Sequence, residues 1–401
     1  YPLFDLLGHL FSWLPVGAVA FRFGLISSLV VLLSLAFILK TCAVVADKLT
    51  LNKKASGYLG EALLVVAALF FLSCQSVFSQ CLSAKGCIYT LTLLIISVLI
   101  RIRVSKLKES RVIYAAWFLW GLGLANHWQT VILLVPFMIF LTVQKQGFTV
   151  KNTLFFCFFT VLGISLYLYL PLRAALLAQP SWGFPLNWTD FKWVVSRQLV
   201  GGEEMKIHSL GFYGGALTAM ARSFQLWIPG VAALAVLGLW VVYRIEKNLT
   251  RDFFILFSAV VLALAGVHEA NNLYLMPVYL TVLSGLVVLL SFAGLFWLLS
   301  KGGRPFQKTM AVVLLLFSFF WCWSSFEMED RSRYTLAEDF GVNVLKCLPK
   351  NAVLLADGDN YVMPLWYVKY VDRLRPDVIV EPTVFLYHEW GWSQLGLQAG
   401  D

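Results

Sequence analysis

Charged residues are scarce in this sequence. They make up 13% of its 401 residues, whereas hydrophobic residues make up 60%. The mean hydropathy is +0.78. A soluble globular chain is about one-quarter charged and about half apolar. The composition therefore excludes a soluble enzyme, a disordered chain and a fibrous protein, and it predicts a polytopic membrane protein.

Several motifs that carry chemistry are also missing. The sequence has no P-loop, no glycine-rich nucleotide fingerprint, no GxSxG and no HExxH. Without a nucleotide site, any energy source is an ion gradient or a pre-activated lipid substrate, or none is needed. The seven cysteines lack CxxC or His/Cys spacing, so we interpret them as small apolar residues. We expect no metal site and no required cofactor, and nothing supports a divalent metal.

The first residues lack the marks of a signal peptide. They contain no basic stretch and no cleavage site, and the chain starts at Tyr1 rather than at a methionine. We interpret the sequence as an interior piece of a longer protein.

Apolar runs of membrane length, separated by polar loops, predict ten spanning helices. The predicted spans are Phe23–Val45, Leu59–Phe78, Cys87–Ile100, Val112–Leu124, Thr130–Val143, Asn152–Leu172, Ser223–Tyr243, Phe253–Val267, Leu273–Leu299 and Thr309–Trp323.

Basic residues predict the orientation. Five short alternate loops hold 17 of the 31 Lys and Arg residues: 40–55, 101–111, 145–151, 244–251 and 301–308. Positive charge in short loops marks the cytoplasmic side. The N-terminal segment, the long loop and the C-terminal tail would then lie outside the cytoplasm. The net charge of +9 is thus an orientation signal, and no nucleic-acid partner is expected.

The stretch 112–143 predicts a helical hairpin. It is too long for one helix, and basic loops flank both of its ends. The chain should therefore turn at Ala125–Gln129. Because each arm is too short to cross a core of about 30 Å, the turn should line a water-filled vestibule on the outer side.

The composition divides the chain into two domains. Residues 1–326 form an all-α polytopic bundle of about ten helices with an outer loop, 173–222. Residues 327–401 form a small extracytoplasmic α/β region, interpreted as truncated. In that region 351–356 and 377–381 resemble strands, with a helix at 363–371 between them.

Polar side chains in or beside a membrane bundle are functional candidates. Each also has a structural interpretation: Asp5 and His9 can simply be solvated, Asn126 and His127 can cap the hairpin turn, and Arg173 can be an interfacial anchor. The candidates for substrate or lipid-phosphate binding are Asn126, His127, Arg173, His268, Glu269 and Asn272. Asp5 is a weak catalytic candidate.

Four groups of segments together resemble one known family. They are Tyr1–Gly8 with Leu14–Arg22; Gly121–Trp128 with Pro136; Tyr167–Ala174 with Asn187 and Trp188; and Asp357–Asn360 with Pro364–Tyr367 and Leu374–Val378. The chain resembles the former domain-of-unknown-function family related to the animal transmembrane protein O-mannosyltransferase, within the GT-C glycosyltransferase superfamily. One departure is 84–89, where relatives usually have an acidic residue shortly before a tyrosine.

The resemblance implies an inverting glycosyltransferase. It would move a mannose-like sugar from a polyprenyl-phosphate donor to a hydroxyl of a protein or glycan acceptor on the outer face. The resemblance places the catalytic acidic residue upstream of Tyr1. In such an enzyme, we expect Arg173 and His127 to stabilise the negative charge of the leaving phosphate. The protein would be a multi-pass protein of the bacterial cytoplasmic membrane, or of the endoplasmic reticulum in a eukaryote.

Two other functions remain open from the residues alone. A transporter or flippase for a lipid-linked or anionic solute would suit ten helices equally, although the sequence shows no internal repeat. A non-catalytic membrane scaffold would use the tail as its binding module.

Overall fold

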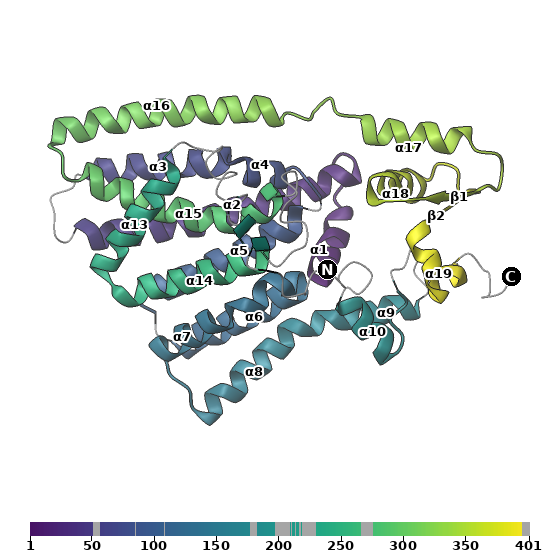
Figure 1. Ribbon diagram of the computed structural model, residues 1–401, viewed down its shortest axis with the longest axis horizontal. Coiled ribbons are helices and arrows are strands. Elements are labelled where there is room, and N and C mark those ends of the chain that lie inside the picture. The colour runs from purple at the N-terminus through teal and green to yellow at the C-terminus, as the bar shows by residue number, and fades with distance from the viewer. Residues whose placement is uncertain are drawn as a thin grey trace. The chain divides into compact units, whose positions relative to one another are not determined.

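The computed structural model describes residues 1–50, 57–84, 86–107, 109–176, 183–196, 209, 211–212, 214–215, 218, 230–265 and 276–394. The chain divides into two compact units (Figure 1). The first unit contains residues 1–167 and 203–329, and the second contains 168–202 and 330–401. Residues 168–202 thus group with the C-terminal tail. The predicted domain boundary at 326/327 stays a prediction.

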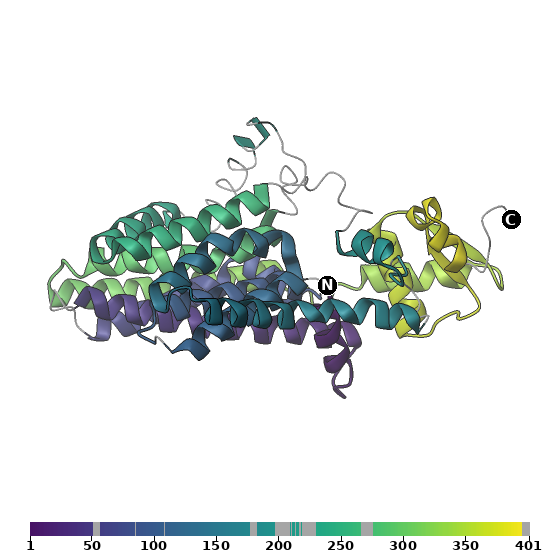
Figure 2. The same ribbon diagram turned by 90° about the horizontal axis from the view of Figure 1, so that it is seen from below.

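The first unit is a helical bundle. In both views most of its helices run side by side along one direction (Figure 1 and Figure 2). Its described helices are α1 (Pro2–Ser12), α2 (Val19–Thr50), α3 (Gly57–Ser73), α4 (Gln75–Cys81), α5 (Gly86–Val104), α6 (Ser110–Val131), η1 (Ile132–Leu134), α7 (Val135–Lys145), α8 (Val150–Ile164), α13 (Val231–Ile245), α14 (Lys247–Ala265), α15 (Met276–Leu299) and α16 (Arg304–Glu329). The turn η2 (Ser165–Leu168) follows α8.

Every predicted span overlaps one of these helices, so the all-α polytopic fold is confirmed. By length and hydropathy, six described helical stretches can cross a membrane, or seven if the bent pair α3 and α4 is one span. This number is lower than ten because α14 and α13 are not among the counted stretches and because the hairpin is counted as one. The helix α13 has only 15 residues, and 110–145 counts once although it folds back on itself.

Burial separates central from peripheral helices. The apolar windows of α5 and α15 are 78% buried within the protein, whereas those of α16 and of the stretch 150–175 are 17% buried. A helix that is apolar on all sides belongs in a core or in lipid. The helices α5 and α15 therefore form the centre of the bundle, whereas α16 and the stretch 150–175 present apolar side chains outward.

Two glycines bring α13 and α15 into backbone contact. A Cβ atom at Gly238 would lie 1.7 Å from the carbonyl oxygen of Leu290, and one at Gly294 would lie 2.3 Å from that of Leu234. No larger residue fits either position without moving a helix. Small residues of this kind allow close helix packing where lipid removes the hydrophobic drive for association.

The predicted hairpin is present. Trp117 Nε1 donates to Thr142 Oγ1 at 3.0 Å, and Trp120 Nε1 donates to the carbonyl of Val131 at 2.9 Å. A straight helix would separate Trp117 from Thr142 by about 37 Å. The chain therefore reverses between α6 and α7. The backbone leaves helical geometry at His127 (φ −144°, ψ 76°), inside the predicted turn.

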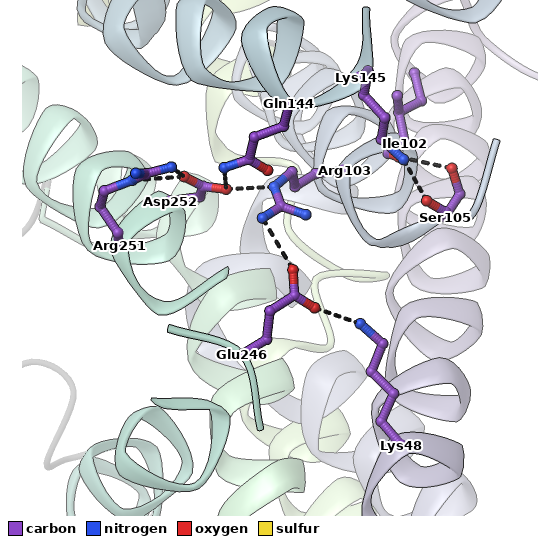
Figure 3. A network of polar contacts seen from close by, with 9 residues as sticks. All are labelled: Lys48, Ile102, Arg103, Ser105, Gln144, Lys145, Glu246, Arg251 and Asp252. Carbon is purple, nitrogen blue, oxygen red and sulfur yellow. Dashed lines mark hydrogen bonds and ion pairs between the residues drawn. The ribbon is translucent and has the colours of Figure 1, made fainter. Parts of the chain in front are cut away.

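A partly buried ionic network joins four helices at one end of the bundle, which we call the Arg103 end (Figure 3). Arg103 donates to Asp252, and its Nη2 lies 3.3 Å from Glu246 Oε1. Lys48 Nζ lies 2.7 Å from Glu246 Oε2, and Gln144 Nε2 donates to Asp252 Oδ2 at 3.2 Å. Asp252 is fully buried, and Arg103 is 7% exposed. The network thus joins the ends of α2, α5 and α7 to the start of α14.

The basic loops share this end. Four of them meet at the network, since it contains residues of 40–55, 101–111 and 244–251 and since Lys145 donates to the carbonyl of Ser105. The fifth, 301–308, follows Trp297, whose ring lies 5.1 Å from that of Trp240 on α13. If successive loops lie on alternate sides of a membrane, these five loops must all lie at the same end of the bundle. Which side of the membrane the Arg103 end faces stays a prediction.

The second unit contains the predicted β-α-β segment. Its elements are α9 (Tyr169–Ala175), α10 (Trp188–Val195), α17 (Leu336–Cys347), β1 (Val353–Ala356), α18 (Asp359–Trp366), η4 (Tyr367–Val371), β2 (Ile379–Pro382), η5 (Thr383–Tyr387) and α19 (Glu389–Gln394). The strands β1 and β2 pair in parallel, with Val353 opposite Ile379. The core of this segment is formed by the side chains of Leu345, Val362, Leu365, Val368, Val378 and Val380.

An arginine closes the loop before β2. Arg375 has a positive φ of 49° and donates to the carbonyls of Leu345, Leu348 and Pro349. Its guanidinium also donates to both oxygens of Asp377, and this pairing holds the pKa of that carboxyl well below its usual range. The fork of the guanidinium thereby ties the end of α17 to the start of β2.

The ionic network gives the first prediction. Asp252→Asn leaves the buried Arg103 charge without its main partner, which typically costs roughly 3–5 kcal/mol. We expect a clearly lower melting temperature in detergent. The double variant Asp252→Asn with Arg103→Gln removes both charges, so it should recover part of the loss. A double variant that is no more stable than Asp252→Asn alone would contradict this account.

Candidate functional site

A cluster of polar and aromatic side chains lies at the opposite end of α5 from the ionic network. Tyr89 and Arg103 are separated along α5 by about 21 Å. At the Tyr89 end the break in α6 places His127 against α5 and α1. We call this region the His127 end of the bundle.

His127 is held between two aromatic rings. Its ring is nearly parallel to that of Tyr1, at 6° and 6.0 Å between centroids, and it lies 5.4 Å from the ring of Tyr89. Its Nδ1 lies 2.8 Å from Thr130 Oγ1, one turn further along the chain. The side chain is 4% exposed. The hydroxyl and the two rings together fix the position and the orientation of the imidazole.

Asn126 precedes the break and is 1% exposed. Its Nδ2 donates to the carbonyl of Ile88 at 2.7 Å and to Thr92 Oγ1 at 3.2 Å, so both hydrogen bonds of that nitrogen go to α5. A carbonyl can only accept, which fixes the orientation of the amide. The other end of the amide, Oδ1, is buried and has no hydrogen-bond partner among the described residues.

An unsatisfied buried carbonyl oxygen is costly, at about 1–3 kcal/mol. A hydroxyl or an amine of a bound molecule would remove this cost by donating to Asn126 Oδ1. The arrangement therefore favours a ligand that carries hydroxyl groups at this position.

A hydrogen bond from η2, the turn after α8, stabilises the break in α6. The hydroxyl of Tyr167 donates to the carbonyl of Leu124 at 3.1 Å, one turn before His127. Irregular backbone at membrane depth persists only where such groups satisfy it or where it lines a cavity.

The helix α1 brings a carboxylate close to the same region. Asp5 Oδ2 lies 3.6 Å from the backbone nitrogen of Tyr1, whose ring contacts His127. The Asp5 side chain is 41% exposed. Desolvation raises the pKa of Asp5 above its usual value of 3.8. His9 is exposed on the same helix and contacts Trp13.

Arg173 belongs to the second unit. It lies in α9, is exposed, and has no carboxylate partner among the residues that the structure describes. The structure does not place it relative to His127, so the predicted pairing of these two residues stays a prediction.

The other three candidates, His268, Glu269 and Asn272, lie outside the described residues. Within the described ranges, no group of three or more His, Cys, Asp or Glu side chains could hold a metal ion.

The sequence analysis missed several members of the cluster. Tyr89 and Thr92 were not candidates because they belong to an apolar span, and Thr130 and the ring of Tyr1 were not singled out. Tyr89 could have been chosen as a candidate, because it belongs to the segment 84–89, which departs from the family pattern. The departure had suggested a weaker role for this segment, yet its tyrosine contacts His127.

Comparisons with known proteins agree with the resemblance. The model of the N-terminal domain of protein O-mannosyl-transferase TMEM260 matches residues 1–151, and that of TMEM260-associated domain 2 matches residues 337–401. Protein O-mannosyl-transferase tmem260 of Dictyostelium discoideum is 22% identical over 444 residues, which cover 97% of this chain and 52% of that protein. Protein O-mannosyl-transferase TMEM260 of Mus musculus is 23% identical over 419 residues, covering 97% and 57%.

No solved structure matches the chain. The chain spans about half the length of the curated relatives that it matches. The two family models cover the helices around the His127 end and most of the β-α-β region, in the same chain. The chain is thus a multi-pass membrane relative in the TMEM260-like family.

Proposed function

We propose that the protein is a membrane glycosyltransferase that moves a mannose-like sugar from a polyprenyl-phosphate donor to an acceptor hydroxyl, at the His127 end of the bundle. The observation that carries the proposal is the buried, unpartnered Oδ1 of Asn126 beside the break at His127. The names of the matched relatives, protein O-mannosyl-transferases, support the reaction class.

In the proposed reaction the acceptor hydroxyl attacks the anomeric carbon, and the bond from that carbon to the phosphate oxygen breaks. Configuration therefore inverts. The base is the acidic residue that the family resemblance implies, assisted by Asp5, and it takes the proton of the acceptor hydroxyl. The leaving polyprenyl phosphate carries negative charge, which Arg173 and His127 stabilise. Asn126 accepts a hydrogen bond from a sugar or acceptor hydroxyl and so orients it.

The site faces the outer side in this proposal, because the basic Arg103 end would face the cytoplasm. The acceptor is then a protein or glycan outside the cytoplasm. Sugar-independent flux of a lipid-linked solute through proteoliposomes, without transfer, would favour a transporter instead.

Asn126 provides the most direct test. Asn126→Leu keeps the side-chain volume but removes Oδ1 together with Nδ2 and its hydrogen bonds to α5, so we expect kcat/KM for transfer in the full-length protein to fall roughly 10-fold to 100-fold. Thr92→Val is the matched control, because it removes only a partner of Nδ2 and leaves Oδ1 in place. If the two variants lost transfer equally, Asn126 would have only a structural role.

Arg173 provides a second test. Arg173→Gln should lower kcat for transfer by about 10²-fold, since the loss of one donor to a developing oxyanion typically has this size. Lys192→Gln changes an exposed cation of the same unit and should leave kcat unchanged. Turnover of Arg173→Gln at the wild-type rate would remove Arg173 from the mechanism.

Asp5 predicts a pH dependence. Because desolvation raises its pKa above 3.8, the carboxylate that assists the base is lost as the pH falls through that raised value. We expect kcat/KM to fall on acidification, and Asp5→Asn should change the midpoint of that acid limb. The measurement is a pH profile of transfer for both proteins. Superimposable profiles would exclude Asp5 from the proton transfer.

A further inference from the structure

The Arg103 end of the bundle carries a second group of cations, at the end of α13 and just after α15, that the ionic network does not include. Arg244 follows Trp240 by one turn, and its guanidinium carbon lies 4.7 Å from the centre of the Trp240 ring. Lys301 follows Trp297 by one turn, and its Nζ lies 3.4 Å from the centre of the Trp297 ring. The two indoles touch edge to face, at 5.1 Å between centroids.

This group of side chains is rigidly supported. The two helices are in backbone contact at Gly238 and Gly294, within about one turn of the indoles. Each cation is held on a ring face, and each ring packs against the other. The separation of the two charges is thus set by the helix packing, rather than by flexible side chains alone.

The charges are exposed and not neutralised. Arg244 and Lys301 are both exposed, and neither has a carboxylate partner among the described residues. Lys247 adds a third exposed cation, over the ring of Tyr243 at 5.6 Å. The nearby carboxylates are already engaged, because Glu246 pairs with Lys48 and Arg103 while Asp252 pairs with Arg103.

The surroundings of the cations are apolar and face outward. Trp240 is 40% exposed, Tyr243 48% and Leu298 46%. In a membrane helix, tryptophan and tyrosine at such a position lie at the level of the lipid headgroups. A cation held against an aromatic ring still directs its N–H groups away from the ring face, so it can donate to a phosphate.

We propose that Arg244, Lys301 and Lys247 form a binding site for the phosphate headgroup of an anionic phospholipid, with Trp240 and Trp297 as its floor. Charge complementarity selects the headgroup, and the exposed apolar surface accommodates the acyl chains. Basic pockets between membrane helices bind anionic headgroups by the same combination. The site lies at the end of the bundle opposite to the proposed catalytic region and does not depend on the proposed reaction.

Lipid binding measured by native mass spectrometry tests the proposal. Purified protein is titrated with phosphatidylglycerol or with phosphatidylcholine that carries the same acyl chains. We expect phosphatidylglycerol to bind about tenfold more tightly. Arg244→Gln with Lys301→Gln should abolish this preference. Trp240→Leu with Trp297→Leu should weaken it although every charge is retained, since the cations lose their support.

The matched control is Lys106→Gln with Arg111→Gln. It removes one lysine and one arginine that are also exposed in a basic loop of the Arg103 end, but for which the described part of the chain shows no ring contact. This control should keep the full preference. Melting temperatures without added lipid verify that all variants are folded.

Three results would overturn the proposal. The first is an equal loss of preference in the control pair, which would show a general effect of net charge. The second is displacement of phosphatidylglycerol by inorganic phosphate alone, which would show an anion site that does not require a lipid. Retention of the preference in Arg244→Gln with Lys301→Gln would also contradict it.

Discussion

Backbone and side-chain polar groups inside a membrane bundle must find partners within the protein, and the break at His127 is where this constraint acts most strongly here. A helix that stops at membrane depth exposes carbonyl and amide groups that lipid cannot satisfy. Tyr167 donates to one such carbonyl, and Trp120 donates to another on the far side of the turn. The amide nitrogen of Asn126 is bound to α5. The proposed site therefore depends on the same contacts that allow the hairpin to turn.

These contacts also determine which polar atoms of the site remain available to bind a ligand. The Nδ2 atom of Asn126 is engaged in holding the break, whereas its buried Oδ1 atom has no hydrogen-bond partner among the described residues. Aromatic rings of Tyr1 and Tyr89 enclose the imidazole of His127. An orientation that is fixed before the ligand arrives reduces the entropy lost on binding, which is the usual advantage of a preorganised site. The proposed transfer reaction needs such positioning, because its two substrates must meet in line.

Much of the fold could be predicted because the membrane imposes simple rules on sequence. Apolar length gave the helices, and the basic flanks of 112–143 required a turn near Ala125–Gln129, where His127 is found. The parallel pairing of β1 and β2 followed from two short apolar runs separated by a helix. The partners of His127 could not be predicted in the same way. Tyr89 and Thr92 lie within an apolar run, and only the three-dimensional packing of α5 against α6 brings them to the break. Asp252 and Arg103 are 149 positions apart, and their pairing likewise depends on packing that no local pattern encodes.

The two ends of the bundle stabilise their buried polar groups in different ways. At the Arg103 end, charges meet charges, and a buried arginine is compensated by two carboxylates. Such a network is specific about which helices meet, because each charge left without its partner is heavily penalised. At the His127 end the groups around the imidazole are amides, hydroxyls and aromatic rings, whose unmet hydrogen bonds cost less than an unpaired buried charge. A ligand can therefore enter and leave the neutral end at a modest energetic cost, whereas rearranging the charged end would break ion pairs. An ion-paired end that keeps the helices together and a neutral hydrogen-bonding end that can receive a hydroxyl would suit the proposed transfer from a lipid-borne donor.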